Sequence, residues 1–530
     1  MNLLEINTLS LRIGSKEILK DVSFHLAPGE ILAVTGESGS GKSMTAFSVM
    51  QLLPEAAEVT GSICLEGRDL LQQSEEAMCD LRGSSIGMVF QEPMTALNPV
   101  KTIGAQVMET ILIHKAMPPE QAEDHARELL ARVGLPPERF PLSRFPHELS
   151  GGQRQRVVIA MAIALRPKLL IADEPTTALD VTTQAQILEL LQDLVQEYDM
   201  GLLIITHDLA VVAELADHIV VMRHGEVVET GSTQGLLRDM QHPYTRMLFA
   251  ASKHQVTLPA PQSPSPLLEV RGAIRDYPLP RTSLFAKPQS FRAVRNVSLT
   301  LNRGERLGLV GESGCGKSTL TRAILGLEPL QGGEILLDGA PLAAIRNPEQ
   351  RRKMQVVFQD PVGSFNPRHR VDRLITEPFY ALPNAPKGGA REDLIAETLR
   401  AVGLGPEDAH KYIHQFSGGQ RQRIAIARAL ITRPELIIFD EAVSALDVSV
   451  RARILDLLVE LCEAYGLTYL FISHDLSVVR TVTDRCLVMQ KGEIVEQGNT
   501  KEIFDDPQHP YTQQLIQAAP VLPDLDQGAA

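Results

Sequence analysis

Alternating apolar and polar residues at the start of the chain predict β-structure. Residues 5–11 and 18–26 follow the two-residue period of half-buried strands, and a Pro-Gly turn at 28–29 ends the second of them. The uninterrupted apolar run 31–35 is typical of a fully buried strand, and residues 61–67 read as a further strand between two glycines. We therefore expect the chain to open with an antiparallel β-subdomain around one buried strand.

The pattern changes to helical spacing between residues 102 and 134, where apolar residues recur every three or four positions with charges between them. Apolar strands follow at 169–172 and 202–206, separated by a helical stretch at 182–198. This alternation predicts a parallel α/β sheet with an inserted helical subdomain, and residues 218–230 read as a closing hairpin.

The whole pattern occurs twice. Lys317 follows the equivalent Lys42 by 317 − 42 = 275 residues, and Glu441 follows Glu174 by 441 − 174 = 267. Later matching residues keep the offset of 267, so the register is fixed over most of the repeat. We predict two tandem domains joined by a semi-rigid, exposed Pro/Ser-rich linker: residues 1–255, the linker 256–267, and residues 268–530.

Each half has a glycine-rich loop directly after its buried strand. Both loops fit the pattern G-x-x-x-x-G-K-[ST], in which backbone N–H groups surround phosphate oxygens, the lysine reaches the β- and γ-phosphates and the last hydroxyl binds Mg²⁺. One match would also suit an ordinary turn, but two matches after apolar strands predict nucleotide triphosphate binding. The residues are Gly36, Glu37, Ser38, Gly39, Ser40, Gly41, Lys42 and Ser43 in the first loop, and Gly311, Glu312, Ser313, Gly314, Cys315, Gly316, Lys317 and Ser318, followed by Thr319, in the second.

Cys315 stands where the first loop has a serine. It lies among free amides beside Lys317, a setting that lowers the pKa of a thiol. The alternative role is a small filler residue.

Two acids directly follow the apolar strand at 169–172, and two more follow the equivalent strand of the second half. Ligands of parallel sheets bind at the carboxyl ends of strands, so these acids should face the phosphate loop. We expect Asp173 and Asp440 to hold Mg²⁺ through its water shell, and Glu174 and Glu441 to polarise the water that attacks the γ-phosphate.

A Ser-Gly-Gly sequence precedes a helical run in each half. Free N–H groups and a hydroxyl at a helix N-terminus make an anion site, although Ser-Gly-Gly alone is a common helix cap. Here it lies at the same distance before both acidic pairs, 174 − 150 = 24 and 441 − 417 = 24. The residues are Ser150, Gly151 and Gly152, and Ser417, Gly418 and Gly419.

With this sequence, Ser-Gly-Gly-Gln, the chain resembles the nucleotide-binding subunits of ATP-binding cassette (ABC) transporters over nearly its whole length. The resemblance implies two P-loop NTPase domains with RecA-like cores, and ATP with Mg²⁺ as ligands. It implies a head-to-tail pseudo-dimer, in which the phosphate loop of one half and the Ser-Gly-Gly loop of the other enclose each ATP. Further implied site residues are Gln91 and Gln359 as Mg²⁺ ligands, His207 and His474 as γ-phosphate sensors, and Asp180 and Asp447 between the two sites.

The adenine-binding position differs between the halves. The family stacks an aromatic residue from the opening strands on the base, which is the role expected of Tyr277. The first half has Arg12 or Ile13 at that place.

The glutamine loops, at 91–99 and 359–367, resemble those of the oligopeptide/dipeptide/nickel importer branch, as does the repeated His-Pro-Tyr-Thr at 242–245 and 509–512. Fusion in one chain resembles the ATPase of the enterobacterial importer for microcin C and other peptides. The branch implies two integral-membrane permease subunits, an indirect periplasmic peptide-binding partner, one chain per transporter and a peripheral place on the cytoplasmic face of the inner membrane. No iron–sulfur cluster is expected, because residues 490–530 contain no cysteine.

Composition narrows the alternatives. A net charge of −14 argues against a surface that binds nucleic acid, and we find neither a signal peptide nor a spanning run. The five cysteines have no C-x-x-C spacing, which favours a reducing cytoplasm. The main alternative is a soluble tandem ATPase acting on ribosomes, whose long charged linker the chain lacks. A tandem sugar-importer ATPase would lack His-Pro-Tyr-Thr, and a DNA-repair ATPase would need zinc cysteines or a coiled coil.

Overall fold

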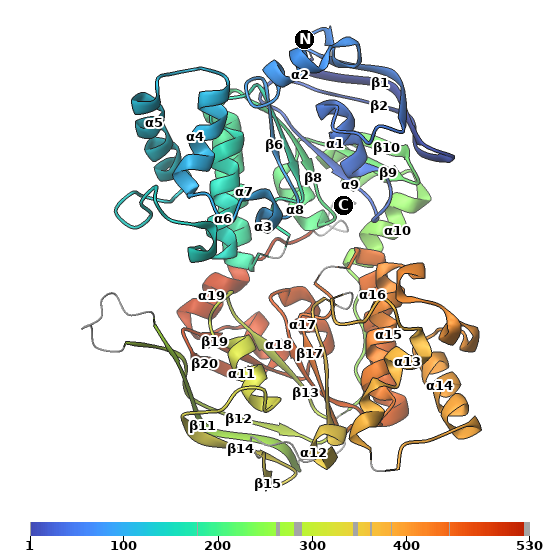
Figure 1. Cartoon of the computed structure of the whole chain (residues 1–530). Helices are drawn as coiled ribbons and strands as arrows, with labels where there is room; N and C mark the ends of the chain where they lie inside the picture. The colour runs from blue at the N-terminus through green and yellow to red at the C-terminus, as the bar shows by residue number, and fades with distance from the viewer. Residues whose placement is uncertain are drawn as a thin grey trace.

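The computed structural model describes residues 2–177, 179–260, 265–279, 289–342, 348–360, 363–382, 384–444 and 446–523. The chain forms two halves of the same architecture, one above the other in Figure 1. Within these residues, no helix combines the length and apolar character that crossing a membrane requires.

A six-stranded sheet forms the centre of each half. Its middle strands are parallel and buried on both faces, as the apolar runs predict, and an antiparallel hairpin adds the last strand. In sheet order the first half has β10 (Glu226–Ser232), β9 (His218–Arg223), β3 (Ile31–Thr35), β8 (Gly201–Ile205), β7 (Leu169–Asp173) and β6 (Ile86–Val89). The second half has β16 (Met354–Val357), β17 (Leu436–Asp440), β18 (Thr468–Ile472), β13 (Arg306–Val310), β19 (Arg485–Gln490) and β20 (Glu493–Asn499).

A four-stranded antiparallel sheet packs beside each central sheet. The predicted strand at 61–67 begins earlier than expected, because Gly61 lies inside β4 and not at its start. Gly61 has φ +101° opposite a register shift in β1, and a Cβ there would lie 2.5 Å from the Thr8 carbonyl oxygen, so this glycine marks a bulge. The sheets contain β2 (Lys16–Leu26), β1 (Leu4–Ile13), β4 (Ala57–Leu65) and β5 (Arg68–Asp69), and β12 (Ser290–Asn302), β11 (Pro266–Pro278), β14 (Gly332–Leu337) and β15 (Ala340–Pro341).

Helices cover the central sheets and build the inserted subdomains, where the predicted helical stretch becomes α4 and α5. The first half has α1 (Lys42–Met50), α2 (Glu75–Leu81), α3 (Pro93–Ala96), α4 (Ile103–Ile113), α5 (Pro119–Arg132), α6 (Gly151–Ala162), α7 (Val181–Tyr198), α8 (Leu209–Leu215), α9 (Thr233–Arg238) and α10 (Pro243–Ser252). The second has α11 (Lys317–Ile324), α12 (Pro348–Lys353), α13 (Val371–Ile375), α14 (Gly389–Ala401), α15 (Gly418–Leu430), α16 (Val448–Tyr465), α17 (Leu476–Val482), α18 (Thr500–Asp505) and α19 (Pro510–Gln517). Short 3₁₀ turns are η1 (Leu70–Gln72), η2 (Pro146–Glu148), η3 (Glu377–Ala381), η4 (Pro406–His410) and η5 (Ile413–Gln415).

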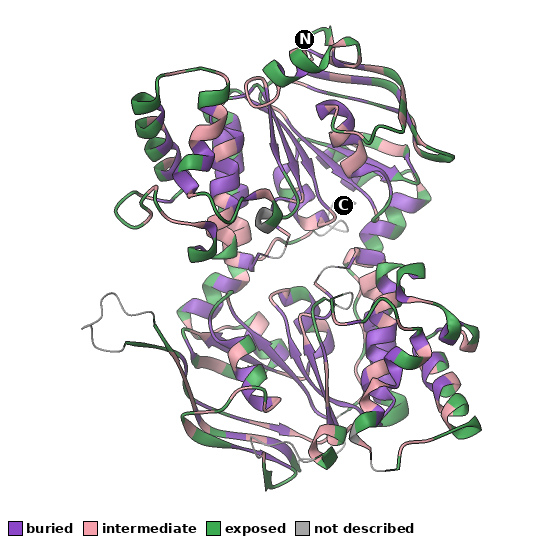
Figure 2. Ribbon diagram, viewed as in Figure 1, coloured by how far each residue is buried: buried purple, intermediate pink, exposed green. Residues whose placement is uncertain are grey.

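Each half has one buried apolar cluster between sheet and helices and a second between the two sheets, seen as purple ribbon in Figure 2. The clusters also join the halves. Val181 of the first half and Val256 of the linker pack against the second half's core, and Leu522 near the C-terminus packs against the first half's core. Helix α10 contacts α16, and α19 contacts α7.

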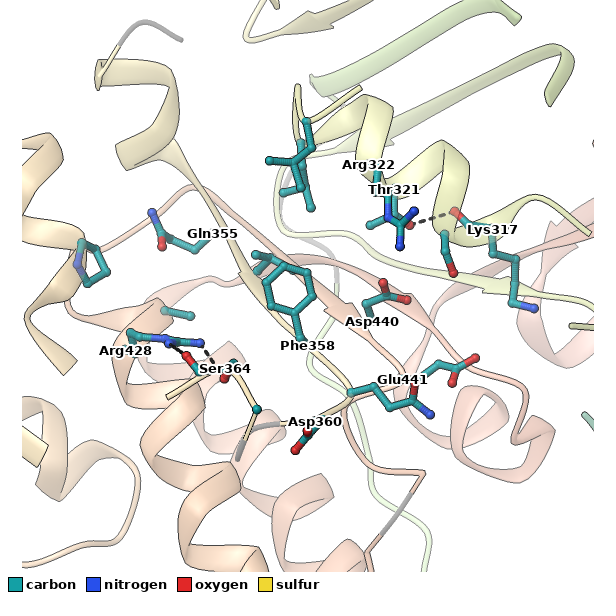
Figure 3. Close-up of a pocket in the computed structure, with 18 of the residues that line it drawn as sticks. Lys317, Thr321, Arg322, Gln355, Phe358, Asp360, Ser364, Arg428, Asp440 and Glu441 are labelled. Atoms are coloured by element: carbon teal, nitrogen blue, oxygen red, sulfur yellow. Dashed lines mark hydrogen bonds between the residues drawn. The ribbon is translucent and has the colours of Figure 1, made fainter. Parts of the chain in front are cut away.

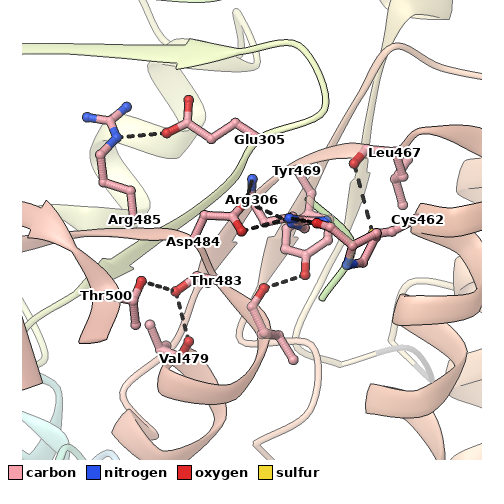
Figure 4. Close-up of polar contacts among 12 residues, drawn as sticks. Glu305, Arg306, Cys462, Leu467, Tyr469, Val479, Thr483, Asp484, Arg485 and Thr500 are labelled. Atoms are coloured by element: carbon pink, nitrogen blue, oxygen red, sulfur yellow. Dashed lines mark hydrogen bonds and ion pairs between the residues drawn. The ribbon is translucent and has the colours of Figure 1, made fainter. Parts of the chain in front are cut away.

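The start of the linker is only partly the exposed spacer that its composition predicts, with Thr257 and Ala260 exposed. Val256, Leu258 and Pro259 are half-buried, and the Pro259 carbonyl accepts a hydrogen bond from the Arg306 guanidinium. Arg306 is itself only 2% exposed and pairs with Asp484 at 2.7 Å (Figure 4). Because a buried guanidinium needs acceptors, it holds this segment against the second half. Residues 261–264 of the linker lie outside the described residues.

Candidate functional site: two phosphate loops and their surroundings

The first phosphate loop connects the central strand β3 to α1. Gly36 and Gly41 have φ of +147° and +104°, which favour glycine. A Cβ on Gly36 would lie 2.1 Å from the Met222 carbonyl oxygen, and one on Gly41 would lie 2.5 Å from the Leu19 side chain. The glycines therefore allow a close backbone approach, and Gly311 and Gly316 repeat the same geometry in the second half.

The lysine of each loop is buried and bonded to the loop itself. Lys42 Nζ donates to the carbonyl oxygens of Gly36 at 2.7 Å and Glu37 at 3.0 Å. Burial lowers the pKa of Lys42, against the opposing effect of nearby acids that include Asp447 of the other half. Lys317 makes the same two bonds, at 2.6 and 2.9 Å.

Cys315 is 7% exposed, and its Sγ lies 3.9 Å from Lys317 Nζ. Burial raises the pKa of the Cys315 thiol and outweighs the lowering effect of Lys317. The expectation of a lowered thiol pKa was therefore wrong, because the loop closes over the sulfur.

The acidic pair of the first half faces its phosphate loop, as the strand order predicts. The Ser43 hydroxyl donates to Asp173 Oδ1 at 3.2 Å. Burial raises the pKa of Asp173 to about 6, and the charge of Glu174 adds to the shift. Asp440 shows the same upward direction, for the same two reasons. Hydroxyl and carboxylate oxygens are the ligands that Mg²⁺ prefers, and a cation would compensate the buried negative charge of the aspartate.

Glu174 is the centre of a polar cluster. It accepts hydrogen bonds from Gln91 Nε2 at 3.0 Å and from the Thr177 hydroxyl at 2.9 Å, and His207 Nδ1 lies 3.2 Å from its carboxylate. Burial alone would raise the pKa of Glu174, but the bond and charge of His207 bring it down to about 2. Burial lowers the pKa of His207, but the bond to Glu174 and its charge raise it more, so the net shift is upward.

The second half repeats this pair, with His474 Nδ1 at 3.4 Å from Glu441. Burial raises the pKa of Glu441, but the bond to His474 lowers it more, so the net shift is downward. These residues line a cavity of about 1000 Å³, together with Lys317, Ser318, Gln359 and Asp440. Figure 3 shows Lys317, Asp440 and Glu441 around this cavity.

Each phosphate loop is contacted by an aspartate of the other half. Asp447 Oδ1 accepts a hydrogen bond from the Ser38 amide at 2.9 Å, and Asp180 Oδ2 accepts one from the Ser313 amide at 3.3 Å. Asp180 also lines the second cavity. Each phosphate loop thus contacts the loop that follows the acidic pair of the other half.

The Ser-Gly-Gly loops begin helices earlier than their apolar runs predict. Ser150 caps α6 by accepting from the Gln153 amide at 3.3 Å, and the Gln153 side chain accepts from the Ser150 amide at 3.0 Å. Ser417 caps α15 in the same way, and Gly151 and Gly418 are the first helical residues. Among the described contacts, none joins Ser150 or Ser417 to the opposite phosphate loop, so the predicted closure over ATP stays a prediction.

Tyr277 lies on β11 with one ring face covered, since the Arg275 guanidinium carbon is 4.7 Å from the ring centroid. Its hydroxyl bonds to Glu328 and lies 3.5 Å from the Thr319 hydroxyl. Stacking on adenine would use the other face. In the first half Arg12 is exposed and Ile13 half-buried.

A buried tyrosine contacts each phosphate loop, and the sequence analysis does not predict this contact. The Glu37 amide donates to the Tyr244 hydroxyl at 3.0 Å, and the Glu312 amide donates to the Tyr511 hydroxyl at 2.9 Å. Both tyrosines belong to the repeated His-Pro-Tyr-Thr, which as a sequence indicates the importer branch but not this contact.

The chain belongs to the ABC transporter family, whose model matches residues 19–177 and 294–444. A second model, "Oligopeptide/dipeptide transporter, C-terminal region", matches residues 228–258 and 495–529. These matches confirm the predicted family, the tandem α/β fold and ATP as the nucleotide.

Among curated proteins the chain is similar to glutathione import ATP-binding proteins. That of Salmonella typhimurium is 46% identical, over 95% of this chain and 87% of the relative. That of Escherichia coli O6:H1 is 46% identical, over 95% and 86%. Among solved structures, the cbiO1 protein of Clostridium perfringens, part of an ABC transporter complex, aligns with TM-score 0.40 at 28% identity over 46% of this chain and 92% of that one.

Proposed function

We propose that the chain is the ATP-hydrolysing, energy-coupling subunit of an inner-membrane importer for peptides or peptide-like compounds. The main support is that both halves combine a full set of hydrolysis residues with a match to the oligopeptide/dipeptide transporter C-terminal region. The relatives named for glutathione import agree with this cargo class, because glutathione is a tripeptide.

The two ATP sites in this proposal are composite. Site one uses the first phosphate loop, Gln91, Asp173, Glu174 and His207, and is closed by Ser417, Gly418 and Gly419; site two uses the second loop, Gln359, Asp440, Glu441 and His474, and is closed by Ser150, Gly151 and Gly152. The contacts of Asp447 and Asp180 with opposite loops support a head-to-tail arrangement. The capped N-termini of α6 and α15 provide free amides for the γ-phosphate when the halves approach.

The residues of site one have defined tasks in hydrolysis. Glu174 is held as a carboxylate by His207, so it orients the attacking water and accepts its hydrogen bond. His207, whose pKa is shifted upward, donates to the γ-phosphate through the ring nitrogen that does not face Glu174. Lys42 exchanges its bonds to the Gly36 and Glu37 carbonyls for phosphate oxygens.

We propose that Ser43, Asp173 and Gln91 hold Mg²⁺ in site one, and Ser318, Asp440 and Gln359 in site two. Bound Mg²⁺ would neutralise charge that develops on the phosphate oxygens. Gln91 donates to Glu174 through Nε2 in this structure, and its Oε1 is the atom that would bind Mg²⁺.

The partners in this proposal are two integral-membrane permease subunits, with a periplasmic peptide-binding protein acting through them. One chain serves one transporter, since fusion makes the pairing of the halves intramolecular. The chain would lie on the cytoplasmic face of the inner membrane. A tandem ATPase that acts on ribosomes is the alternative, and no feature of the site favours it.

The test is to purify the chain with the membrane proteins that copurify with it and to reconstitute them in lipid vesicles. We expect ATP hydrolysis to rise when peptides and a peptide-binding protein are supplied. Copurification with ribosomes, and no membrane partner, would overturn the proposal.

A further inference from the structure

The His-Pro-Tyr motif of each half fixes a helix beside the phosphate loop. His242 caps α10, because its Nδ1 accepts from the Tyr244 amide at 3.2 Å, and the His242 amide donates to Glu229 of β10 at 3.2 Å. In the second half His509 caps α19 at 3.2 Å and donates to Glu496 at 3.1 Å. The motif thus anchors the start of the helix to the hairpin at the edge of the central sheet.

The anchored tyrosine then reaches the phosphate loop. Tyr244 is 3% exposed, and the Arg223 guanidinium carbon lies 4.8 Å from its ring centroid. Its hydroxyl accepts the Glu37 amide hydrogen, and the Gly36 carbonyl of the same peptide group accepts a hydrogen bond from Lys42. The tyrosine therefore holds, from behind, the peptide group that also holds the phosphate-binding lysine. Burial raises the pKa of Tyr244 to about 12, so the hydroxyl stays neutral.

We propose that Tyr244 and Tyr511 are positioning residues for the two phosphate loops, and that they link each loop to the helix that contacts the other half. This inference rests on the ATP sites of the proposed function but not on the cargo. In this proposal the tyrosines act through the loops and not directly on the nucleotide. They set the position of Glu37 or Glu312, and through it that of the lysine.

The link to the other half is visible beyond the end of α10. His254 Nε2 lies 2.7 Å from Asp456 of α16, and Lys253 donates to the Pro523 carbonyl at 3.0 Å. The start of the same helix α16 returns to the first phosphate loop, where the Ser449 hydroxyl donates to the Glu37 carboxylate. Tyr244, α10 and α16 therefore form a closed ring of contacts with the loop. A shift of α16 would act on Glu37 through Ser449 directly and through α10 and Tyr244.

The test uses Tyr244→Phe and Tyr511→Phe in the full chain, because phenylalanine keeps the buried ring and removes only the acceptor. We expect each variant to weaken Mg-ATP binding at its own site about five-fold, and to raise the KM for ATP with kcat within about two-fold. Binding is measured with a fluorescent ATP analogue and hydrolysis at saturating and limiting ATP. Tyr198→Phe is the matched control, since Tyr198 lies at the end of α7 and packs under Arg166.

A purely structural role would lower the melting temperature of the Tyr244→Phe and Tyr511→Phe proteins without splitting KM from kcat. The inference is overturned by that result, or by ATP affinity equal to that of Tyr198→Phe. Loss of ATP affinity combined with absence of peptide stimulation would contradict the proposed cargo and leave the positioning role supported, so the two failures are distinguishable.

Discussion

The two phosphate loops have nearly the same sequence but are held differently from across the interface. Loop one is held by two residues of the second half, because Asp447 accepts the Ser38 amide and the Ser449 hydroxyl binds Glu37. Among the hydrogen bonds of the described residues, the first half gives loop two only the longer Asp180 contact. The residue equivalent to Ser449 is Thr182, whose hydroxyl is buried without a hydrogen-bond partner in the described part of the chain. The two halves therefore share the phosphate loop itself, while the residues that contact it from the other half differ.

The difference extends to the adenine side and to the tails. Tyr277 offers a ring in the second half, where the first half has Arg12 and Ile13. The His254–Asp456 pair joins the end of α10 to α16, and the equivalent positions in the other pairing are Val521 and Glu189. We infer that site one is better braced by polar contacts from the other half, and site two better equipped to stack on the base.

The largest effect is expected from the catalytic glutamates. Glu174→Gln and Glu441→Gln should each impair transport, and the double variant should lose at least about 100-fold in hydrolysis and trap the closed, ATP-loaded protein. Turnover and retention of labelled ATP are measured for both single variants and the double. Unequal single variants would show that the sites differ in activity as well as in bracing.

Glu120→Gln on the exposed face of α5 is the control for these changes. A double variant that hydrolyses ATP at the wild-type rate would contradict the assignment of both glutamates.

Removing the histidine of each His–Glu pair should reveal how much that pair contributes to stability. His207→Ala leaves Glu174 buried with Gln91 and Thr177 as its remaining partners, so we expect a loss of roughly 2 kcal/mol in the free energy of unfolding near neutral pH. His474→Ala should destabilise in the same direction, because the bond to His474 likewise lowers the pKa of the buried Glu441. Denaturant unfolding at a series of pH values measures both.

The pH dependence follows from the directions of the shifts. The raised pKa of His207 makes its contribution full below its unfolded pKa of about 6.5 and lost as the pH rises through the folded value. The lowered pKa of Glu174 makes its contribution full above about 4.5 and lost as the pH falls toward 2. The difference between wild type and His207→Ala should therefore be greatest between about pH 4.5 and 6.5, and a difference independent of pH would contradict the ion pair.

Much of this site could be predicted because its chemistry depends on local sequence. The glycines of the phosphate loops, the acids at the ends of β7 and β17 and the capped Ser-Gly-Gly helices each lie within a few residues of the element that positions them. The roles of Tyr244 and Ser449 could not be predicted in this way, since their partner Glu37 lies 207 and 412 residues away in sequence. The bulge at Gly61 and the burial of Pro259 likewise depend on partners from distant segments.

Ser449→Ala against Thr182→Ala tests the bracing of the loops directly. Ser449→Ala removes a hydrogen bond to a carboxylate at a half-buried site, so ATP binding at site one should weaken by about 1 kcal/mol, or roughly five-fold. Thr182→Ala removes a hydroxyl without a partner among the described residues and should leave site two unchanged. Equal effects of the two variants on ATP affinity would contradict the asymmetry.

The smallest effect is expected at the pair that closes the ring between α10 and α16. His254 and Asp456 side chains are 31% and 50% exposed, so solvent screens their interaction and a double-mutant cycle of His254→Asn and Asp456→Asn should give a coupling of only about 0.5 kcal/mol. Its effect on function should nevertheless differ between the sites. The His254→Asn variant should weaken ATP binding slightly at site one and leave site two unaltered, because the residue equivalent to His254 after α19 is Val521. A coupling of zero, or an equal loss at both sites, would mean that apolar packing by Val256 and Leu522 joins the halves without favouring either loop.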